Sequence, residues 1–196
     1  MKRMLLVLIA AGSTMIASAQ IQFGVKAGYN LANLTFSPSQ AGVSSKSDFS
    51  GGVFASLPLF SSCSLQPEIL YSGQGAAFSD SLATGKLNYG YLNIPVLFKY
   101  QHSSGLFAET GPQVGFLLSA KESFNGQSFD AKSNTQSVDF SWAFGIGYKL
   151  PMGFGIDARY NLGLTNLAKG SGSNEGTAKN SVFQFGLFYM FGESKK

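Results

Sequence analysis

Strict alternation of apolar and polar side chains over twelve residues constrains the fold of this chain more than any other feature. From Val138 to Lys149, the even-numbered positions hold Val, Phe, Trp, Ile or Tyr, whereas the odd-numbered positions hold Asp, Ser, Ala, Gly or Lys. Successive side chains of a β-strand point to opposite faces. The segment is therefore predicted to be a strand with one aromatic, apolar face and one small or charged face.

The same alternation recurs in seven further segments along the chain. Each is long enough to cross a bilayer when the strand is tilted, because a spanning β-strand needs about 9–11 residues. Together they predict eight antiparallel strands. The segments are residues 21–31, 49–57, 64–75, 88–100, 105–119, 138–149, 153–165 and 181–191.

Composition indicates which face of such a sheet meets lipid. The chain holds 18 Phe and 8 Tyr but is only 12% charged, and the aromatics collect on the apolar face of each strand while Gly and charged residues collect on the other. Outer-membrane barrels place aromatics toward lipid and polar side chains inside, whereas a soluble lipocalin-like barrel inverts this arrangement. The pattern favours the membrane barrel, with the soluble barrel as the alternative.

The connections between the predicted strands alternate in length, beginning with a long one. Bacterial outer-membrane barrels have short periplasmic turns and long outer loops. The prediction is an all-β, eight-stranded antiparallel transmembrane barrel of OmpA/OmpX-like size with both termini in the periplasm, and Pro95 and Pro112 mark bulges or gaps in strand pairing. The long connections are residues 32–48, 76–87, 120–136 and 166–180, and the short ones are 58–63, 101–104 and 150–152.

The first 19 residues have the pattern of an export signal. Met1-Lys2-Arg3 is basic, residues 4–16 are largely apolar, and Ala17-Ser18-Ala19 fits a signal peptidase site. The apolar run is too short for a membrane-anchoring helix, which needs about 20 residues. We expect residues 1–19 to be a cleaved signal peptide and residues 20–196 to form one barrel domain in the outer membrane.

Charged side chains on the polar face are predicted to meet inside the barrel. Four are basic and four are acidic, so they can pair. Because a buried charge needs a partner, we expect a closed, ion-paired lumen, which serves either to rigidify the barrel or as a selective, gated path. The predicted network consists of Lys26, Glu68, Lys99, Glu109, Asp139, Lys149, Asp157 and Arg159.

Catalytic and cofactor patterns are absent from the sequence. The single histidine, His102, falls in a predicted turn with no acid suggested beside it, and Cys63 is a single cysteine in a polar turn. No Cys/His metal spacing and no phosphate-binding glycine loop occurs, and no basic stripe suggests nucleic acid. The sequence therefore predicts a protein that is not an enzyme, with no cofactor, no metal and no catalytic residues.

Four segments resemble the PorT family of outer-membrane β-barrel domain proteins of Bacteroidota. They are Phe23–Leu31, Leu65–Gly75, Tyr91–Tyr100 and Phe107–Pro112. The resemblance implies an outer-membrane barrel. Most members have no assigned activity, and the founding name is linked to protein secretion.

The expected function is that of a structural or interaction protein. It would be a monomer in contact with outer-membrane lipid. Its loops or periplasmic turns would bind a protein partner in the periplasm or at the cell surface. A narrow pore for small solutes and an accessory role in protein secretion are the alternatives.

Overall fold

The computed structural model describes residues 21–38, 42–80, 83–124, 127–168 and 176–192. The predicted signal peptide lies outside these residues. Within them, no helix is long and apolar enough to span a membrane.

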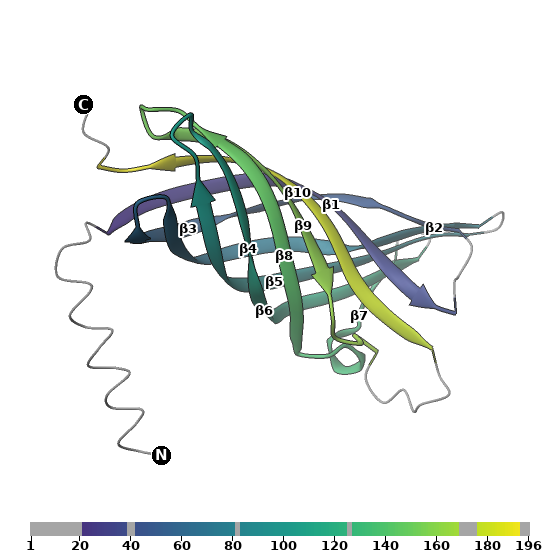
Figure 1. Ribbon diagram of the computed structural model, residues 1–196. Helices are drawn as coiled ribbons and strands as arrows, with labels where there is room; N and C mark the ends of the chain where they lie inside the picture. Colours follow the sequence, from purple (N-terminus) through teal and green to yellow (C-terminus); the bar gives the residue numbers. More distant parts are fainter. Residues whose placement is uncertain (1–20, 39–41, 81–82, 125–126, 169–175, 193–196) are drawn as a thin grey trace, which may run out of the picture.

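Among the described residues, eight long antiparallel strands form the wall of a closed barrel (Figure 1). Each wall strand pairs with the next, and β1 pairs with both β3 and β10, which closes the ring. The predicted eight-stranded antiparallel barrel is confirmed. The wall strands are β1 (Gln22–Ser37), β3 (Lys46–Phe60), β4 (Cys63–Asp80), β5 (Ala83–Gln101), β6 (Leu106–Phe124), β8 (Val138–Lys149), β9 (Phe154–Gly163) and β10 (Thr177–Met190).

The two ends of the barrel differ. One end, here called the turn end, holds the start of β1, the finish of β10 and the three short connections, and its backbone is tied by a hydrogen bond from the Phe191 amide to the Phe23 carbonyl (Figure 1). Gly105 and Gly153 occupy the left-handed region in two of these turns, with φ of 96° and 90°. The opposite end, here called the loop end, holds the other four connections, three of which are longer, whereas β4 and β5 are joined through residues 81–82 alone.

At the loop end the prediction of four long polar connections is wrong in part, because each of the four predicted segments contains strand residues, and two of them show this most clearly. Instead of ending near residue 75, β4 continues to Asp80, where it pairs with Ala83 of β5. Likewise β6 runs to Phe124 and pairs with the short strand β7 (Gln127–Asp130). Backbone pairing continues past the apolar band because a hairpin satisfies its own amide and carbonyl groups. The short strand β2 (Val43–Ser44) and the 3-10 turn η2 (Lys132–Asn134) also lie at this end.

The two faces of the wall are those of a membrane barrel. Large apolar side chains such as Phe154, Phe183 and Leu187 point outward and are 54%, 53% and 66% exposed, whereas charged residues such as Glu68 and Arg159 are buried inside. A soluble lipocalin-like barrel would show the reverse, so that alternative is excluded.

Pro95 and Pro112, the two prolines predicted to disturb strand pairing, interrupt it without shifting the register. Between β5 and β6 the pairing passes from Pro95–Gln113 to Phe98–Thr110 in one register, with the positions around Pro112 unpaired on that side. The register shifts occur elsewhere, at Gly90/Tyr91 and at Pro58/Phe60. Pro95 lies in a similar gap on its β4 side, where the pairing passes from Pro67–Val96 to Leu70–Asn93 in one register. Each of the two prolines thus coincides with a local gap, because it lacks the amide donor.

Candidate functional site

The lumen is the candidate site, and its side chains follow one another in layers from the turn end to the loop end. Aromatic rings come first, then ion pairs, then amides and hydroxyls, and finally an apolar cluster. Each layer is built from residues on several strands.

Arg159 on β9 is the centre of the ion-paired layer. Its Nη1 and Nη2 donate to Oε2 and Oε1 of Glu68, at 2.8 Å each. Its Nε and Nη2 donate to Oε1 of Glu109, at 3.0 and 2.6 Å. All three side chains are almost completely buried. A guanidinium engaged with two carboxylates in this way makes strong, directional contacts that hold strands β4, β6 and β9 together.

Glycine makes the Arg159–Glu109 contact possible. Strand β8 lies between β6 and β9, and its Gly145 is in register with both Glu109 and Arg159. A Cβ at this position would lie 2.9 Å from the Glu109 side chain. The missing side chain lets the two charged groups meet above the intervening strand.

Lys26 and Asp157 repeat this arrangement across a different strand. The Lys26 Nζ lies 2.7 Å from Oδ2 of Asp157, and both side chains are buried. Strand β10 lies between them, and a Cβ on its Gly186 would come within 2.9 Å of both side chains. Two ion pairs thus each bridge a strand at a glycine.

Lys99 connects the ion-paired layer with the aromatic layer at the turn end. Its Nζ lies 3.5 Å from the centre of the Phe107 ring and donates to Oε1 of Gln66 at 3.3 Å. Cation–π contacts of this kind favour a buried ammonium. Phe188 packs edge-on against both Phe54 and Phe107, with ring centres 5.9 Å apart. These rings, with Met190, fill the lumen just inside the turn end.

The structure brings six of the eight predicted network residues into one charge-balanced cluster. Asp139 lies apart from them near the loop end, where its Oδ2 accepts a 2.7 Å hydrogen bond from Nδ2 of Asn180. Lys149 is half-buried at the last position of β8, near the turn end. The six clustered residues are Lys26, Glu68, Lys99, Glu109, Asp157 and Arg159.

Amides and hydroxyls occupy the lumen between the ion pairs and the loop end. Asn30 donates to Oγ of Ser72 at 3.0 Å, and Gln113 donates to Oγ of Ser141 at 2.9 Å. Gln184 donates to the Ser50 hydroxyl. This layer is polar but carries little charge.

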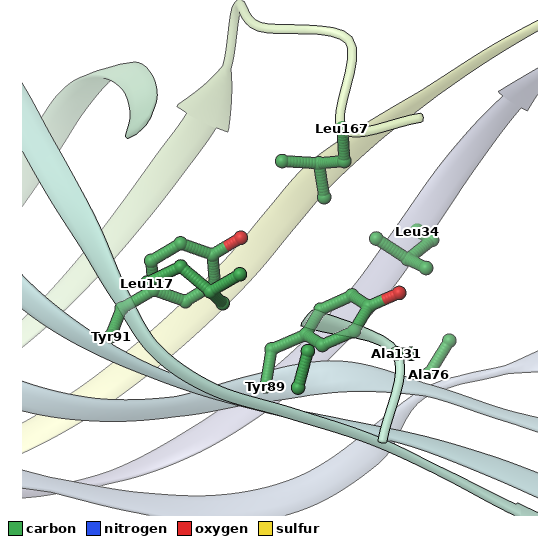
Figure 2. Packing of buried hydrophobic residues seen from close by; sticks show 8 residues of the cluster. Leu34, Ala76, Tyr89, Tyr91, Leu117, Ala131 and Leu167 are labelled. Atoms are coloured by element: carbon green, nitrogen blue, oxygen red, sulfur yellow. The ribbon is translucent and has the colours of Figure 1, made fainter. Parts of the chain in front are cut away.

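A buried apolar cluster closes the loop end (Figure 2). Its members come from the wall and also from the connections: Ala131 precedes η2, and Leu167 follows β9. Sequence analysis missed this cluster because Leu34, Ala131 and Leu167 fall in segments read as polar loops. The signal was present, since apolar residues in polar segments need burial. The cluster consists of Leu34, Ala76, Tyr89, Tyr91, Leu117, Ala120, Ala131 and Leu167.

The residues considered for catalysis lie outside the lumen. His102 is exposed in the turn after β5, and its Nδ1 lies 3.0 Å from the Ser104 hydroxyl. Cys63 is a half-buried free thiol at the start of β4. In the part of the chain that the structure describes, no three His, Cys, Asp or Glu residues form a group able to hold a metal ion.

Comparison with known proteins agrees with this architecture. Neisserial surface protein A has 16% sequence identity and a TM-score of 0.54, over 86% of this chain and 97% of that one. The attachment invasion locus protein Ail of Yersinia pestis has 17% identity and a TM-score of 0.48, over 87% of this chain and 98% of that one. No curated protein sequence matches. The outer membrane protein beta-barrel domain family matches residues 13–169. The chain belongs to this family, and it is an integral β-barrel protein of the outer membrane.

Proposed function

We propose that this protein acts without catalysis, as a structural or interaction protein whose closed barrel presents binding surfaces at its two ends. The observation that carries the proposal is the filled lumen. Rings of Phe54, Phe107 and Phe188 occupy one end, the Arg159 ion pairs follow, and an apolar cluster occupies the other end.

A filled lumen disfavours the narrow pore. Water or ions passing through would have to separate Arg159 from Glu68 and Glu109, which leaves buried charges without partners at a cost of several kcal/mol. They would also have to cross two apolar layers. The barrel is better suited to hold its ends rigidly than to conduct.

Bilayer recordings test this part of the proposal. Folded wild-type protein, identified by its heat-modifiable gel mobility, is inserted into a planar bilayer at low salt. We expect no sustained conductance above that of protein-free detergent. Stable conductance steps from the wild type would refute the closed lumen and support the pore.

The orientation we propose places the turn end, with both termini, in the periplasm. Short periplasmic turns and longer outer connections are the general rule for bacterial barrels. Cysteine labelling tests it in a Cys63→Ser background. Phe129→Cys should react with a membrane-impermeant maleimide on intact cells, and Ser103→Cys should react only after the outer membrane is permeabilised. The reverse result would invert the orientation.

The outer contact surface is the β6–β7 hairpin in this proposal. Phe124 and Phe129 are 45% and 55% exposed there. Phe129 lies on β7, which is not one of the wall strands. Aromatic side chains that remain exposed in such a place favour contact with a protein partner. The barrel itself is proposed to be a monomer surrounded by lipid.

Photocrosslinking distinguishes this surface from lipid-facing wall. A photoreactive residue at position 129 should give protein adducts on whole cells. The matched control at position 144 replaces Phe144, which is similarly exposed at 51% but lies within the wall. Equal adducts, or none, at the two positions would argue against the hairpin as a contact site.

An accessory role in secretion is the second candidate, and its support is a polar hollow at the turn end. The hollow measures about 500 Å³, and Ser56, Gln101 and Lys149 are among its lining residues. The resemblance to the PorT family of Bacteroidota points the same way. Deletion of the gene should then reduce secreted protein, whereas the interaction proposal expects loss of a surface or periplasmic complex with secretion unchanged.

A further inference from the structure

Asp139 is the one buried lumen charge that the described residues leave without an opposite charge. Seven charged side chains are buried there. Three basic and three acidic groups form the cluster around Arg159, and at the loop end the half-buried Lys46 pairs with Asp48 at 2.5 Å. Among the fully buried charged side chains of the described residues there is therefore one surplus negative charge, and it lies on Asp139.

The Asp139 carboxylate is held by a single hydrogen bond. Its Oδ2 accepts from Nδ2 of Asn180 at 2.7 Å, but Oδ1 has no partner although the residue is only 5% exposed. Burying an ionised carboxylate with so little compensation is costly. The surroundings must supply a positive charge or a donor.

The neighbouring unpartnered atoms are also oxygens. Oδ1 of Asn180 and the hydroxyl oxygen of Tyr91 are buried and make no hydrogen bond of normal geometry. The Tyr91 hydroxyl lies close enough to both Asn180 and Asp139 to interact with them. Oδ1 of Asn161, on the strand next to Asn180, is unpartnered too. Carboxylate and amide oxygens only accept hydrogen bonds, and the single O–H of Tyr91 can donate to only one of them, so at least one of these acceptors is left without a donor.

We propose that these oxygens bind a monovalent alkali cation. Asp139 Oδ1 supplies the charge, and Asn180 Oδ1 and the Tyr91 hydroxyl oxygen supply neutral ligands. Hard cations prefer such oxygen donors. One surplus negative charge calls for one positive charge, whereas a divalent ion would leave the closed lumen with an uncompensated positive charge. The cation would let the apolar cluster, to which Tyr91 belongs, close over a neutral interior.

Urea unfolding in zwitterionic detergent tests the site. The wild type is compared in sodium chloride, potassium chloride and N-methyl-D-glucamine chloride at equal ionic strength, because the last cation is too large for a buried site. The folded-to-unfolded ratio should rise about tenfold for each tenfold excess of the small cation over its dissociation constant. The large cation should give no such rise.

Variants assign the effect to Asp139. The isosteric Asp139→Asn should lose the difference between small and large cations, and Tyr91→Phe should reduce it. The matched control Asp48→Asn, a carboxylate near the same end that is already paired, should retain it. If the wild type unfolds identically in all three salts, or if Asp139→Asn responds as the wild type does, the proposal is overturned. If Asp139→Asn does not fold, an unchanged response in Tyr91→Phe overturns the assignment, and a reduced one supports it.

Discussion

The turn-end half and the loop-end half of the lumen are filled by different means. In the turn-end half, three basic and three acidic side chains around Arg159 balance one another in charge, and every one of them comes from a wall strand. In the loop-end half, an apolar cluster covers a layer of amides, and Ala131 and Leu167 reach it from the connections. The first half depends only on how the strands align, whereas the second depends also on how the loops fold back.

This difference determines how each half fails. Removing one partner from a buried ion pair leaves the other side chain charged and without its counter-ion in the turn-end half of the lumen. Removing an apolar side chain leaves a cavity whose cost depends on how far the neighbours relax. Damage to the first half should therefore affect the whole barrel, and damage to the second should remain near the loop end.

The largest effect is expected for Arg159→Met. It leaves Glu68 and Glu109 buried without their cation, which should lower the free energy of unfolding by about 3–5 kcal/mol. Urea unfolding of the purified protein measures this. Adding Glu68→Gln and Glu109→Gln to Arg159→Met should recover part of the loss. A single variant as stable as the wild type would show that the ion pairs do not hold the barrel.

A smaller, local effect is expected for Leu34→Ala. Leu34 is 4% exposed within the loop-end cluster, so the cavity should cost about 2–4 kcal/mol. Hydrogen exchange should accelerate at the loop end and not around Arg159. Leu187→Ala is the matched control, because that side chain is 66% exposed on the outer face. Uniformly faster exchange along the barrel would erase the distinction between the two halves.

Glu109→Gln should cost about 1–3 kcal/mol, because the amide keeps an acceptor for Arg159 but removes a charge. Glu68→Gln should cost more, since both carboxylates accept two hydrogen bonds from Arg159 but Glu68 also accepts one from Gln66 at 2.7 Å. The temperature at which the folded band disappears in the heat-modifiable gel shift reports both. The opposite order would mean that Glu109 is the principal partner of Arg159.

The smallest effect is expected for Lys46→Ala, at less than about 1 kcal/mol. Its pair with Asp48 lies near the loop-end rim, and the two side chains are 12% and 20% exposed. The effect should shrink further as salt rises, because partly exposed pairs are screened. A loss of stability as large as that of Glu109→Gln would show that water is excluded from the loop-end rim as fully as from the centre of the lumen.

The wall could be predicted from the sequence because its signal is local. The alternation from Val138 to Lys149 fixes which side chains face lipid without any knowledge of neighbouring strands. The partners inside the lumen could not be predicted in the same way. Lys26 meets Asp157 from 131 positions away, and that meeting depends on the stagger of the strands around the ring, which no single segment encodes.

The extent of the hairpins was also beyond a local pattern. Residues 76–87 were predicted to be a connection because Ser, Asp, Thr, Gly and Lys interrupt the alternation, yet Ala76 and Leu87 occupy facing positions of β4 and β5. Their pairing continues because β4 and β5 are already in register nearer the turn end. The apolar cluster that they help to build becomes visible only when the four connections are brought together.

Gly145 and Gly186 have a consequence for the assembly of the ring. Each lies beneath a contact that joins the strands on either side of it, so β6 is braced to β9 over β8, and β9 to β1 over β10. If β10 slid by two residues, Gln184 or Phe188 would enter the space where Lys26 reaches Asp157. Because only glycine leaves room for these contacts, the two positions favour a single register of the strands. The last two strands to leave the export machinery would then align against β1 by this side-chain fit as well as by backbone pairing.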